Sequence, residues 1–322
     1  MVGWVGLEDK NTITKGEIIM IFTDNYLQEQ ISRTEEFITQ LGQGKNETIL
    51  LDILLSNGNK EKAMAESFVW RQEDNRDIES DLLEGRLEGA ELIGASDAPK
   101  RKKLTNNCQI FSRSASITGT AMALNPLGIK DHLAKEMEAQ MVLLKRGLNQ
   151  VLIEGTIQDE DRDARKPRKM NGLLNFIDTV QDCEGRELTA EDIENTLETL
   201  WKNGEAGDKL CLVNASVKKK LNKIYADVPE ATLQIQAGGN TFGVQATSVI
   251  TDFGTIHIIL DRCMPTDQVV IVKPSELVLS TLRPFEIIDD PKTFDGIKKT
   301  IIGEYGLKVR NTKAHAKILN FR

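Results

Sequence analysis

The clearest alternation of apolar and polar residues lies between Asn125 and Gly155. Asn125 and Pro126 provide a helix cap and a proline at the first helical position. Apolar residues then recur at steps of three or four, at Leu133, Met137, Met141, Leu144, Leu148 and Val151. This period predicts a helix over residues 127–154, about 42 Å long. The opposite face is charged, so we expect one side of the helix to pack and the other to meet solvent or a partner.

The segment that follows Phe68 has a different pattern, which predicts a long two-stranded ribbon with a polar tip. Its first strand is expected to open at Phe68–Trp70 and its second to cover Cys108–Gly119. Eight acidic residues lie within Glu73–Glu91, and the basic cluster Lys100–Lys103 follows a loop signal. Each arm of roughly 16 residues would reach about 50 Å, and a ribbon alone in water is marginally stable. We therefore expect the ribbon to lie against a neighbouring chain.

The remaining patterns predict a mixture of helices and strands. Thr189, three residues before Asp192, forms a relaxed capping box for a helix that ends at Gly204. Residues 232–262 alternate with period two, which is typical of strands, and residues 156–169 form a charged loop. Shorter patterns predict helices at 28–41 and 216–226, an apolar piece at 47–55, and strands at 209–214, 269–272, 277–282, 298–309 and 316–321.

Composition places the chain among ordinary soluble proteins. Its 322 residues, 40% hydrophobic and 28% charged, suffice for two modest domains or one body with long excursions. The formal net charge of −8 argues against a protein whose main task is to grip a nucleic-acid backbone. No stretch approaches the roughly 20 apolar residues of a membrane span, and no secretory signal opens the sequence. We therefore expect an intracellular product with no membrane partner.

The cysteine and glycine patterns indicate packing and turns, and not a metal site or a phosphate-binding loop. Cys108, Cys183, Cys211 and Cys263 lack a paired spacing, which favours buried thiols in a reducing compartment over disulfides or a zinc site. Gly238–Gly243 is rich in glycine but lacks the lysine of a phosphate loop, so it predicts a turn between strands. Neither pattern indicates a bound cofactor.

The acidic run after residue 158 only partly matches a calcium loop. Asp159, Asp161 and Asp163 have the spacing of the first three EF-hand ligands. Ala164 and Met170, however, replace the glycine and the glutamate that such a loop needs, which favours a solvated loop. The three histidines are far apart and share no carboxylate pattern. We therefore expect no metal and no cofactor, and no enzyme activity.

Short segments in a fixed order carry a resemblance to a known family. They are Phe68–Trp70, Asn107–Phe111, Ile117–Thr120, Met170–Leu173, Leu200–Gly204, Asp252–Gly254, Asp261–Pro265, Leu282–Pro284 and Gly303–Asn311. In this order and spacing the sequence resembles the major capsid protein of tailed bacteriophages. The resemblance runs from about Phe68 to the C-terminus and concerns the branch with a short N-terminal region.

The resemblance implies an α+β fold of the tailed-phage capsid type. On that pattern we expect an N-terminal arm at 1–60, an extended β-ribbon loop at 61–120, and a peripheral domain at 121–190 built on a spine helix at 127–154. An axial mixed α/β domain at 191–282 and C-terminal strands at 283–322 that return to the peripheral domain complete it. The short N-terminal region also predicts that assembly uses a separate scaffold or none.

The function implied by the resemblance is that of a shell subunit. Copies of the chain would form hexameric and pentameric capsomers and close into an icosahedral head around double-stranded DNA. The expected partners are other copies of the chain, a portal, scaffolding or decoration proteins, and the packaged DNA, which would be held non-specifically. Assembly is expected in the host cytoplasm, and the mature protein in the virion. A mildly acidic inner wall would repel DNA and ease its release.

The ribbon charges are the candidate site residues. We expect contacts between subunits to involve Glu79, Asp81, Glu84, Arg86, Lys100, Arg101 and Lys102. Exposed ion pairs contribute little binding energy, so they would set the register of the contact more than its strength. Buried apolar contacts of the arm and the long helix should supply most of the cohesion. The alternative is that these charges merely keep a surface loop soluble.

Other protein classes predict different particles. An encapsulin-like nanocompartment shares the fold but encloses cargo protein instead of DNA. A mixed α/β enzyme acting through Asp252, His257 and Arg262 would be a discrete oligomer with a concave pocket. A tail or head-completion component would form rings or tubes. Electron microscopy of the expressed protein distinguishes these alternatives.

Overall fold

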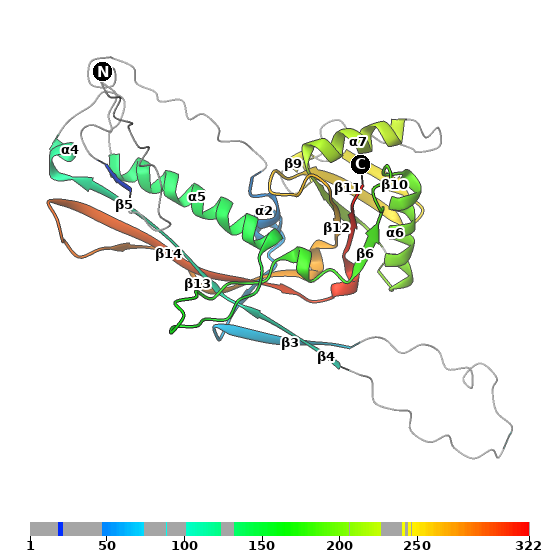
Figure 1. Ribbon diagram of the computed structural model, residues 1–322, viewed down its shortest axis with the longest axis horizontal. Helices are drawn as coiled ribbons and strands as arrows, with labels where there is room; N and C mark the ends of the chain where they lie inside the picture. The colour runs from blue at the N-terminus through cyan, green and yellow to red at the C-terminus, as the bar shows by residue number, and fades with distance from the viewer. Residues whose placement is uncertain are drawn as a thin grey trace, which may run out of the picture. The chain divides into compact units, whose positions relative to one another are not determined.

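A six-stranded sheet and a five-stranded sheet organise the protein (Figure 1). The computed structural model describes residues 19–21, 47–73, 88, 101–123, 132–205, 207–226, 240–241, 244–245 and 247–321. These residues divide into two units. Unit 1 comprises the described parts of Met1–Gln43, Ser112–Leu144 and Phe285–Ile302, and unit 2 those of Gly44–Phe111, Lys145–Pro284 and Gly303–Arg322.

The six-stranded sheet belongs to unit 2 and has the order β10-β11-β7-β12-β15-β6. Its central strand β7 is parallel to β11 and antiparallel to β12. All five residues of β7 are buried, as expected for a strand that is covered on both faces. The strands are β6 (Thr179–Asp182), β7 (Lys209–Val213), β10 (Thr247–Thr251), β11 (Gly254–Leu260), β12 (Val269–Val272) and β15 (Ala316–Leu319).

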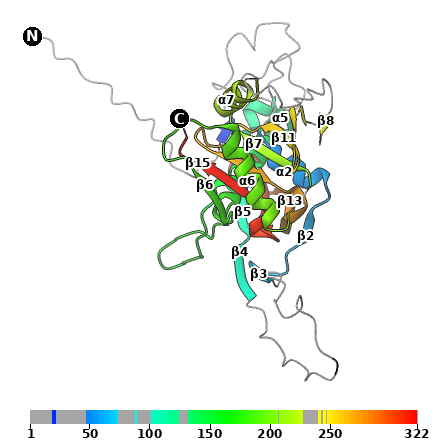
Figure 2. The ribbon, with the colours of Figure 1, turned by 90° about the vertical axis from the view of Figure 1, so that its right-hand side faces the viewer.

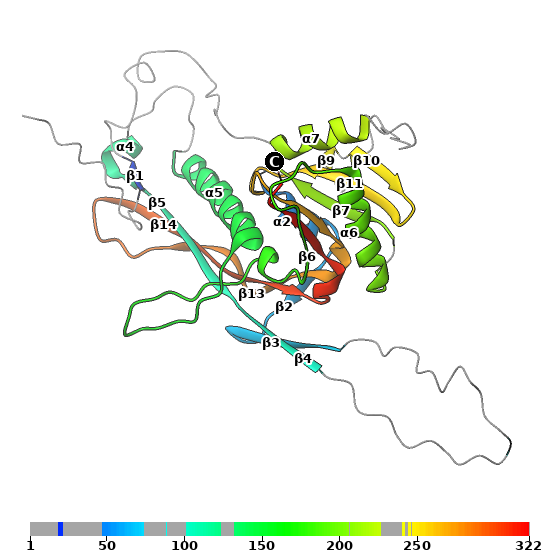
Figure 3. The ribbon, with the colours of Figure 1, turned by 45° about the vertical axis from the view of Figure 1, so that its right-hand side comes forward.

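Two helices, α6 (Ala190–Lys202) and α7 (Ala215–Ala226), pack against this sheet (Figures 2 and 3). The shared core contains Ile193, Leu197 and Leu200 from α6, Val217, Leu221 and Tyr225 from α7, and Val213, Ile258 and Ile271 from the strands. The helical residues recur at steps of three or four, so each helix turns one apolar stripe to the sheet.

Thr189 fixes the start of α6. Its hydroxyl accepts a hydrogen bond from the backbone N–H of Asp192, and the Asp192 carboxylate accepts one from the Thr189 backbone in return. Arg186 also binds this carboxylate, at 2.9 Å. The hydrogen bonds of Arg186 and Thr189 hold the pKa of Asp192 below its ordinary value, although burial acts in the opposite direction. The capping box predicted from sequence is therefore confirmed.

The five-stranded sheet has the order β1-β5-β14-β13-β2. Its outer strands are short and pair in parallel: β1 pairs with Ala115–Ile117, and β2 pairs with Leu279–Thr281. The boundary between the two units falls inside β5, β13 and β14. The strands are β1 (Ile19–Ile21), β2 (Lys60–Lys62), β5 (Gln109–Thr118), β13 (Leu277–Asp289) and β14 (Gly296–Val309).

The longest helix, α5 (His132–Glu154), falls within the predicted range 127–154, and residues 124–131 lie outside the described part of the chain. In unit 2 the side chain of Asn149 accepts a hydrogen bond from the backbone N–H of Leu51, at 3.0 Å. Leu51 belongs to helix α2 (Ile49–Ser56), whose residues Ile49, Leu50, Leu51, Ile53 and Leu54 are all buried. Part of the segment predicted as an arm therefore contributes to the core of unit 2.

Most other predicted elements are confirmed to within two residues: the helices at 189–204 and 216–226 and the strands at 209–214, 269–272, 298–309 and 316–321. The strand predicted at 277–282 continues to Asp289. Within the predicted turn Gly238–Gly243, Asn240–Thr241 form strand β8, which pairs with β9 (Val244–Gln245), and the other residues of this range lie outside the described part of the chain. The helix predicted at 28–41 lies outside the described residues. Short helices complete the fold: α4 (Gly119–Ala123), η2 (Leu173–Asn175), η3 (Pro274–Glu276) and η4 (Thr312–Ala314).

The predicted second strand of the ribbon was wrong. The ribbon consists of β3 (Ser67–Glu73) and β4 (Arg101–Asn107), which pair in antiparallel register from Ser67↔Asn107 to Glu73↔Arg101. Residues 109–118 form β5, a strand of the five-stranded sheet. The basic cluster looked like loop sequence because it is polar, but an exposed ribbon has no core face that would require alternation.

No helix within the described residues is both long and apolar enough to cross a bilayer.

Buried His315 gives unit 2 a pH-dependent stability. Its side chain is fully buried beside β15, and its Nδ1 accepts a hydrogen bond from the backbone N–H of Lys273, at 3.3 Å. Burial, and then the charge of Lys273, lower the pKa of His315 to about 3. The ring is therefore neutral in the folded protein, whereas in the unfolded chain it binds a proton near pH 6.5.

We expect His315→Asn to flatten the loss of stability in mild acid. A depressed histidine pKa stabilises the fold above the unfolded value, and this contribution is lost as the pH falls from about 6.5 towards 3. The slope from this group is at most about 1.4 kcal/mol per pH unit. Asn retains an acceptor for the Lys273 N–H. Urea unfolding between about pH 7 and pH 5 measures the effect, and an unchanged slope in the variant would contradict the assignment.

Candidate functional site at the ribbon base

The end of the ribbon at Ser67 and Asn107, here called the ribbon base, joins it to unit 2. Neither β3 nor β4 pairs with any other described strand. Side-chain contacts must therefore hold the ribbon in place. They come from the segment before β3, from residues 156–178, from β14 and from residues 310–312.

Two buried asparagines connect the ribbon base to the backbone around it. The Asn106 side chain donates to the carbonyls of Leu307, at 2.6 Å, and Asn171, at 3.1 Å, and it accepts from the Asn171 N–H at 2.7 Å. The Asn107 side chain donates to the Asp159 carboxylate at 2.9 Å. Buried amides with satisfied partners fix a geometry, because any displacement leaves polar groups without partners.

Aromatic residues on β3 pack the ribbon against unit 2. Trp70 is buried, stacks on Phe68 at 5.7 Å between ring centroids, and lies at the same distance from Phe176. Its indole N–H donates to the carbonyl of Val309 at 2.7 Å. Gly306 allows the close approach, because a Cβ there would lie 2.7 Å from the Phe68 ring. A side chain at position 306 would therefore push the Phe68 ring away from β14.

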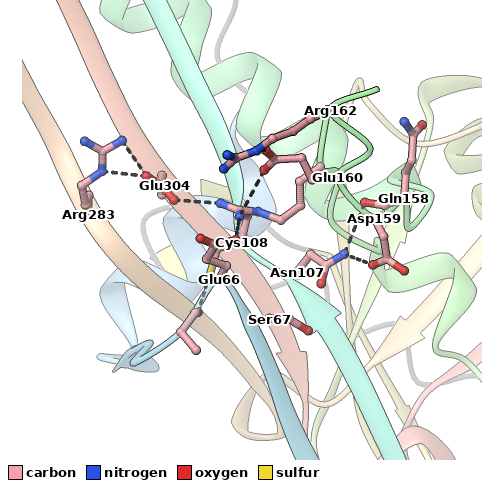
Figure 4. Close-up of polar contacts among 12 residues, drawn as sticks. Glu66, Ser67, Asn107, Cys108, Gln158, Asp159, Glu160, Arg162, Arg283 and Glu304 are labelled. Atoms are coloured by element: carbon pink, nitrogen blue, oxygen red, sulfur yellow. Dashed lines mark hydrogen bonds and ion pairs between the residues drawn. The ribbon is translucent and has the colours of Figure 1, made fainter. Parts of the chain in front are cut away.

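Arg168 lies at the centre of an ion-pair network at the ribbon base, and Figure 4 labels its partners Glu66 and Glu304. Its guanidinium donates to the Cys108 carbonyl, to the Glu66 carboxylate, and to Glu304 at 3.1 Å. Arg283 binds the other oxygen of Glu304 at 2.6 Å. The side chains of Arg168 and Glu304 are each only 8% exposed, so solvent screens this pair less than a surface pair. One arginine thus links three parts of the chain to the ribbon base.

The groups at the ribbon base hold the fold together and are not arranged as a reactive site. Burial raises the pKa of the Cys108 thiol to about 11, so the sulfur is protonated at neutral pH and is a poor nucleophile. The neighbouring side chains of Asn107, Arg168 and Glu304 already make hydrogen bonds or ion pairs within the chain. Among the described residues, no group of three His, Cys, Asp or Glu side chains could hold a metal ion.

The charged loop beside the ribbon base folds back on itself through backbone pairs Gln158↔Lys169 and Asp161↔Lys166. Its residues and Ile110 line a shallow pocket of about 390 Å³. Two aspartates of the calcium-like run have protein partners, since Asp159 accepts from Asn107 and Asp161 from the N–H of Ala164. The carboxylates therefore shape the loop.

Of the predicted contact residues, Arg101 and Lys102 lie at the start of β4. Arg101 pairs with Glu73 across the ribbon at 2.7 Å, and Lys102 pairs with Asp178 at 3.2 Å. Both cations are exposed, and the hydrogen bond and charge of Glu73 raise the pKa of Arg101 further. The other five predicted residues, Glu79, Asp81, Glu84, Arg86 and Lys100, lie outside the described part of the chain.

The residues of the alternative enzyme site do not converge. Asp252 precedes β11 and Arg262 follows it, so a strand of roughly 20 Å separates them. His257 lies within β11 and hydrogen-bonds to Ser248 on the neighbouring strand, while Arg262 pairs with Glu47 at 3.0 Å. These three side chains therefore cannot act on one substrate atom.

Sequence reasoning missed the ribbon-base residues. Asn106 and Arg168 stand in polar stretches with no periodicity, and Glu304 is a single acid within the predicted strand at 298–309. The bonds from Asn106 to Asn171 and Leu307 and the Arg168–Glu304 pair each join residues at least 65 positions apart. The available signals were Trp70, a large apolar residue in a polar segment, and Asn107, which lies in a segment of the family resemblance. Neither signal indicates which residues it contacts.

Comparisons with known proteins assign the fold and the family. A family model described as SU10 major capsid protein matches residues 23–322. The match begins well before Phe68, where the sequence resemblance was expected to start. No curated protein sequence matches the chain.

Solved capsid structures share the fold at low identity. The capsid of the cyanophage A-1(L) is similar with a TM-score of 0.62 and 11% identity, covering 93% of this chain and 99% of that one. The capsid of an empty GTA particle gives 0.60 and 11%, covering 90% and 95%. The holo-SrpI encapsulin complex of Synechococcus elongatus PCC 7942 gives 0.58 and 13%, covering 91% and 94%.

We expect Asn106→Ala to lower the free energy of unfolding by about 3 kcal/mol, because it removes a hydrogen-bond partner from four backbone groups, the carbonyls of Leu307 and Asn171 and the N–H groups of Asn107 and Asn171. Asn203→Ala is the matched control. Its exposed amide makes contacts of 3.4 and 3.5 Å, so we expect a change within about 0.5 kcal/mol. Denaturant unfolding measures both, and equal losses in the two variants would contradict a special role for Asn106.

Proposed function

The chain belongs to the SU10 major capsid protein family, and on that premise we propose that its copies close into an icosahedral head around double-stranded DNA. The match over residues 23–322 is the observation that carries this function. The chain is a shell-forming subunit of a phage head, and self-association into capsomers follows from that role. The capsid fold of the solved structures agrees with it.

The ribbon is proposed to dock on a neighbouring subunit. Its base is fixed by Asn106, Trp70 and Arg168, whereas β3 and β4 pair only with each other among the described strands. A two-stranded ribbon gains stability when a further surface covers it. In a closed shell that surface is an adjacent copy, met through heterologous contacts.

The ribbon charges are proposed to set the register of this contact. Arg101 and Lys102 already bind carboxylates of their own chain, and they remain exposed in these pairs. Exchange of an exposed pair for a similar pair across an interface changes the free energy little, so such charges select geometry more than strength. The same role is proposed for Glu79, Asp81, Glu84, Arg86 and Lys100.

The regions of the chain are proposed to have the roles known in capsid subunits: arm, ribbon, peripheral domain with α5 as its spine helix, axial domain with the six-stranded sheet, and returning C-terminal strands. Hexamers and pentamers, a portal, scaffolding or decoration proteins and the packaged DNA are the proposed partners. The protein would act without catalysis, assembling in the host cytoplasm.

Electron microscopy of the expressed full-length chain tests the proposal. We expect closed polyhedral shells. In particles purified from infected cells we expect nuclease-resistant double-stranded DNA of uniform length. Shells that enclose one cargo protein and no DNA would support a nanocompartment like the encapsulin complex instead. Rings, tubes or a small discrete oligomer would contradict a shell subunit.

We expect reversal of the described ribbon charges, Arg101→Glu with Lys102→Glu, to lower the assembled fraction by about tenfold, with little effect on unfolding of the subunit. Lys219→Glu with Lys223→Glu, on the exposed face of α7, is the matched control. Sedimentation measures assembly and urea unfolding measures the fold. Normal assembly of the ribbon variant, or an equal loss in both variants, would contradict the assignment.

A further inference from the structure

The outer end of β13 is an open sheet edge. In the order β1-β5-β14-β13-β2, the strand beyond β13 is β2, and it pairs only with Leu279–Thr281. Among the described strands, none covers the outer side of Glu286–Asp289. In Figure 1 this stretch is the outer strand of the orange β13–β14 hairpin. The backbone along it presents hydrogen-bonding groups that another strand could use.

This edge lacks most of the devices that block strand pairing. Proteins usually protect edges with lysine, proline or a bulge. Pro284 and Pro291 stand at the two ends of the stretch and limit its length, but the residues between them include no proline and no lysine. Ile287 is 57% exposed and Ile288 is 46% exposed, so apolar side chains accompany the open backbone. The edge therefore suits a docking strand of about five residues.

The charge of the edge selects its occupant. Glu286 and Asp289 are exposed, and Asp290 follows them. Lys299 lies 3.1 Å from Asp289 and Lys298 lies 3.2 Å from Asp290, both on β14 and thus on the inner side of β13. Pairing of this edge with the same edge of a second copy would bring like charges together. A complementary strand carries cations at its ends and β-branched residues between them.

One N-terminal segment has this composition. Lys10-Asn11-Thr12-Ile13-Thr14-Lys15 places two lysines around three β-branched residues. The lysines are five positions apart, and Glu286 and Asp290 are four apart, so both cations can approach acids along an extended pair. The segment precedes the described strand β1.

The segment of the same chain is too short to reach this edge. Strand β1 begins at Ile19 and lies at the opposite edge of the sheet, three strands from β13. Three strand spacings amount to about 14 Å. The four residues from Lys15 to Ile19 span at most about 14 Å, which leaves no length to pass around the sheet and pair. The occupant must therefore come from a second copy.

We propose that the open edge at Glu286–Asp289 binds residues Lys10–Lys15 of a neighbouring subunit as an added β-strand. This inference rests on the proposed shell function. Backbone hydrogen bonds supply affinity in such a contact, and the flanking ion pairs set the register. The interaction commits the N-terminal segment of one subunit to the β13–β14 hairpin of the next.

Disulfide trapping tests the pairing directly. Chains with Ile13→Cys and chains with Ile287→Cys are purified separately, mixed, assembled and oxidised. On non-reducing gels of assembled particles, we expect about ten times more disulfide-linked dimer than with Ile297→Cys in place of Ile287→Cys, and we expect reduction to remove it. Ile297 is also exposed but lies on β14, an inner strand of the sheet. Unassembled subunits should give no such dimers.

The outcomes separate this inference from the shell function. Particles that assemble but give no more cross-link than the Ile297 control would overturn the strand pairing and leave the shell function intact. Failure of the unmodified chain to form particles would overturn both. As a second measurement, we expect Ile287→Lys to reduce the assembled fraction about tenfold relative to Ile297→Lys, with similar urea midpoints. Equal assembly of these two folded variants would also overturn the pairing.

Discussion

The structure depends on one constraint: a two-stranded ribbon cannot bury enough surface to hold itself in place. At the ribbon base, residues from distant parts of the chain contact the ribbon and hold it in place. Asn106 binds the backbone of β14, Trp70 packs on Phe68 and Phe176, and Arg168 joins the ribbon to Glu304. The direction of the described ribbon strands is thus fixed by contacts within unit 2.

Local patterns predicted the elements of the fold well. The α6 cap was visible at Thr189 and Asp192 because a capping box involves neighbours in sequence. Strand β7 was visible as a short apolar run, because a strand buried on both faces has no polar side. The ribbon partner was misplaced because β4 is polar on both faces, so its sequence resembles a loop.

Long-range contacts were out of reach for the same reason. Arg168 stands in a charged loop, and the sequence does not indicate which of the many acids in the chain it pairs with. Its ion pair with Glu304 depends on how β14 passes the 156–172 segment. Gly306 has no local sign of its role, which is to let the Phe68 ring approach the backbone. The family resemblance indicated the architecture, and the three-dimensional contacts then identified the residues that hold it.

The cysteines have a consequence for the life of the particle. Cys108, Cys183 and Cys211 are buried, and burial raises the pKa of Cys108 to about 11 and that of Cys211 to about 12. Thiolate is the form that oxidants attack, so these sulfurs react slowly. A phage head waits in aerated surroundings between hosts. The three buried thiols are shielded during that interval, and the partly buried Cys263 is the cysteine that an oxidant reaches first.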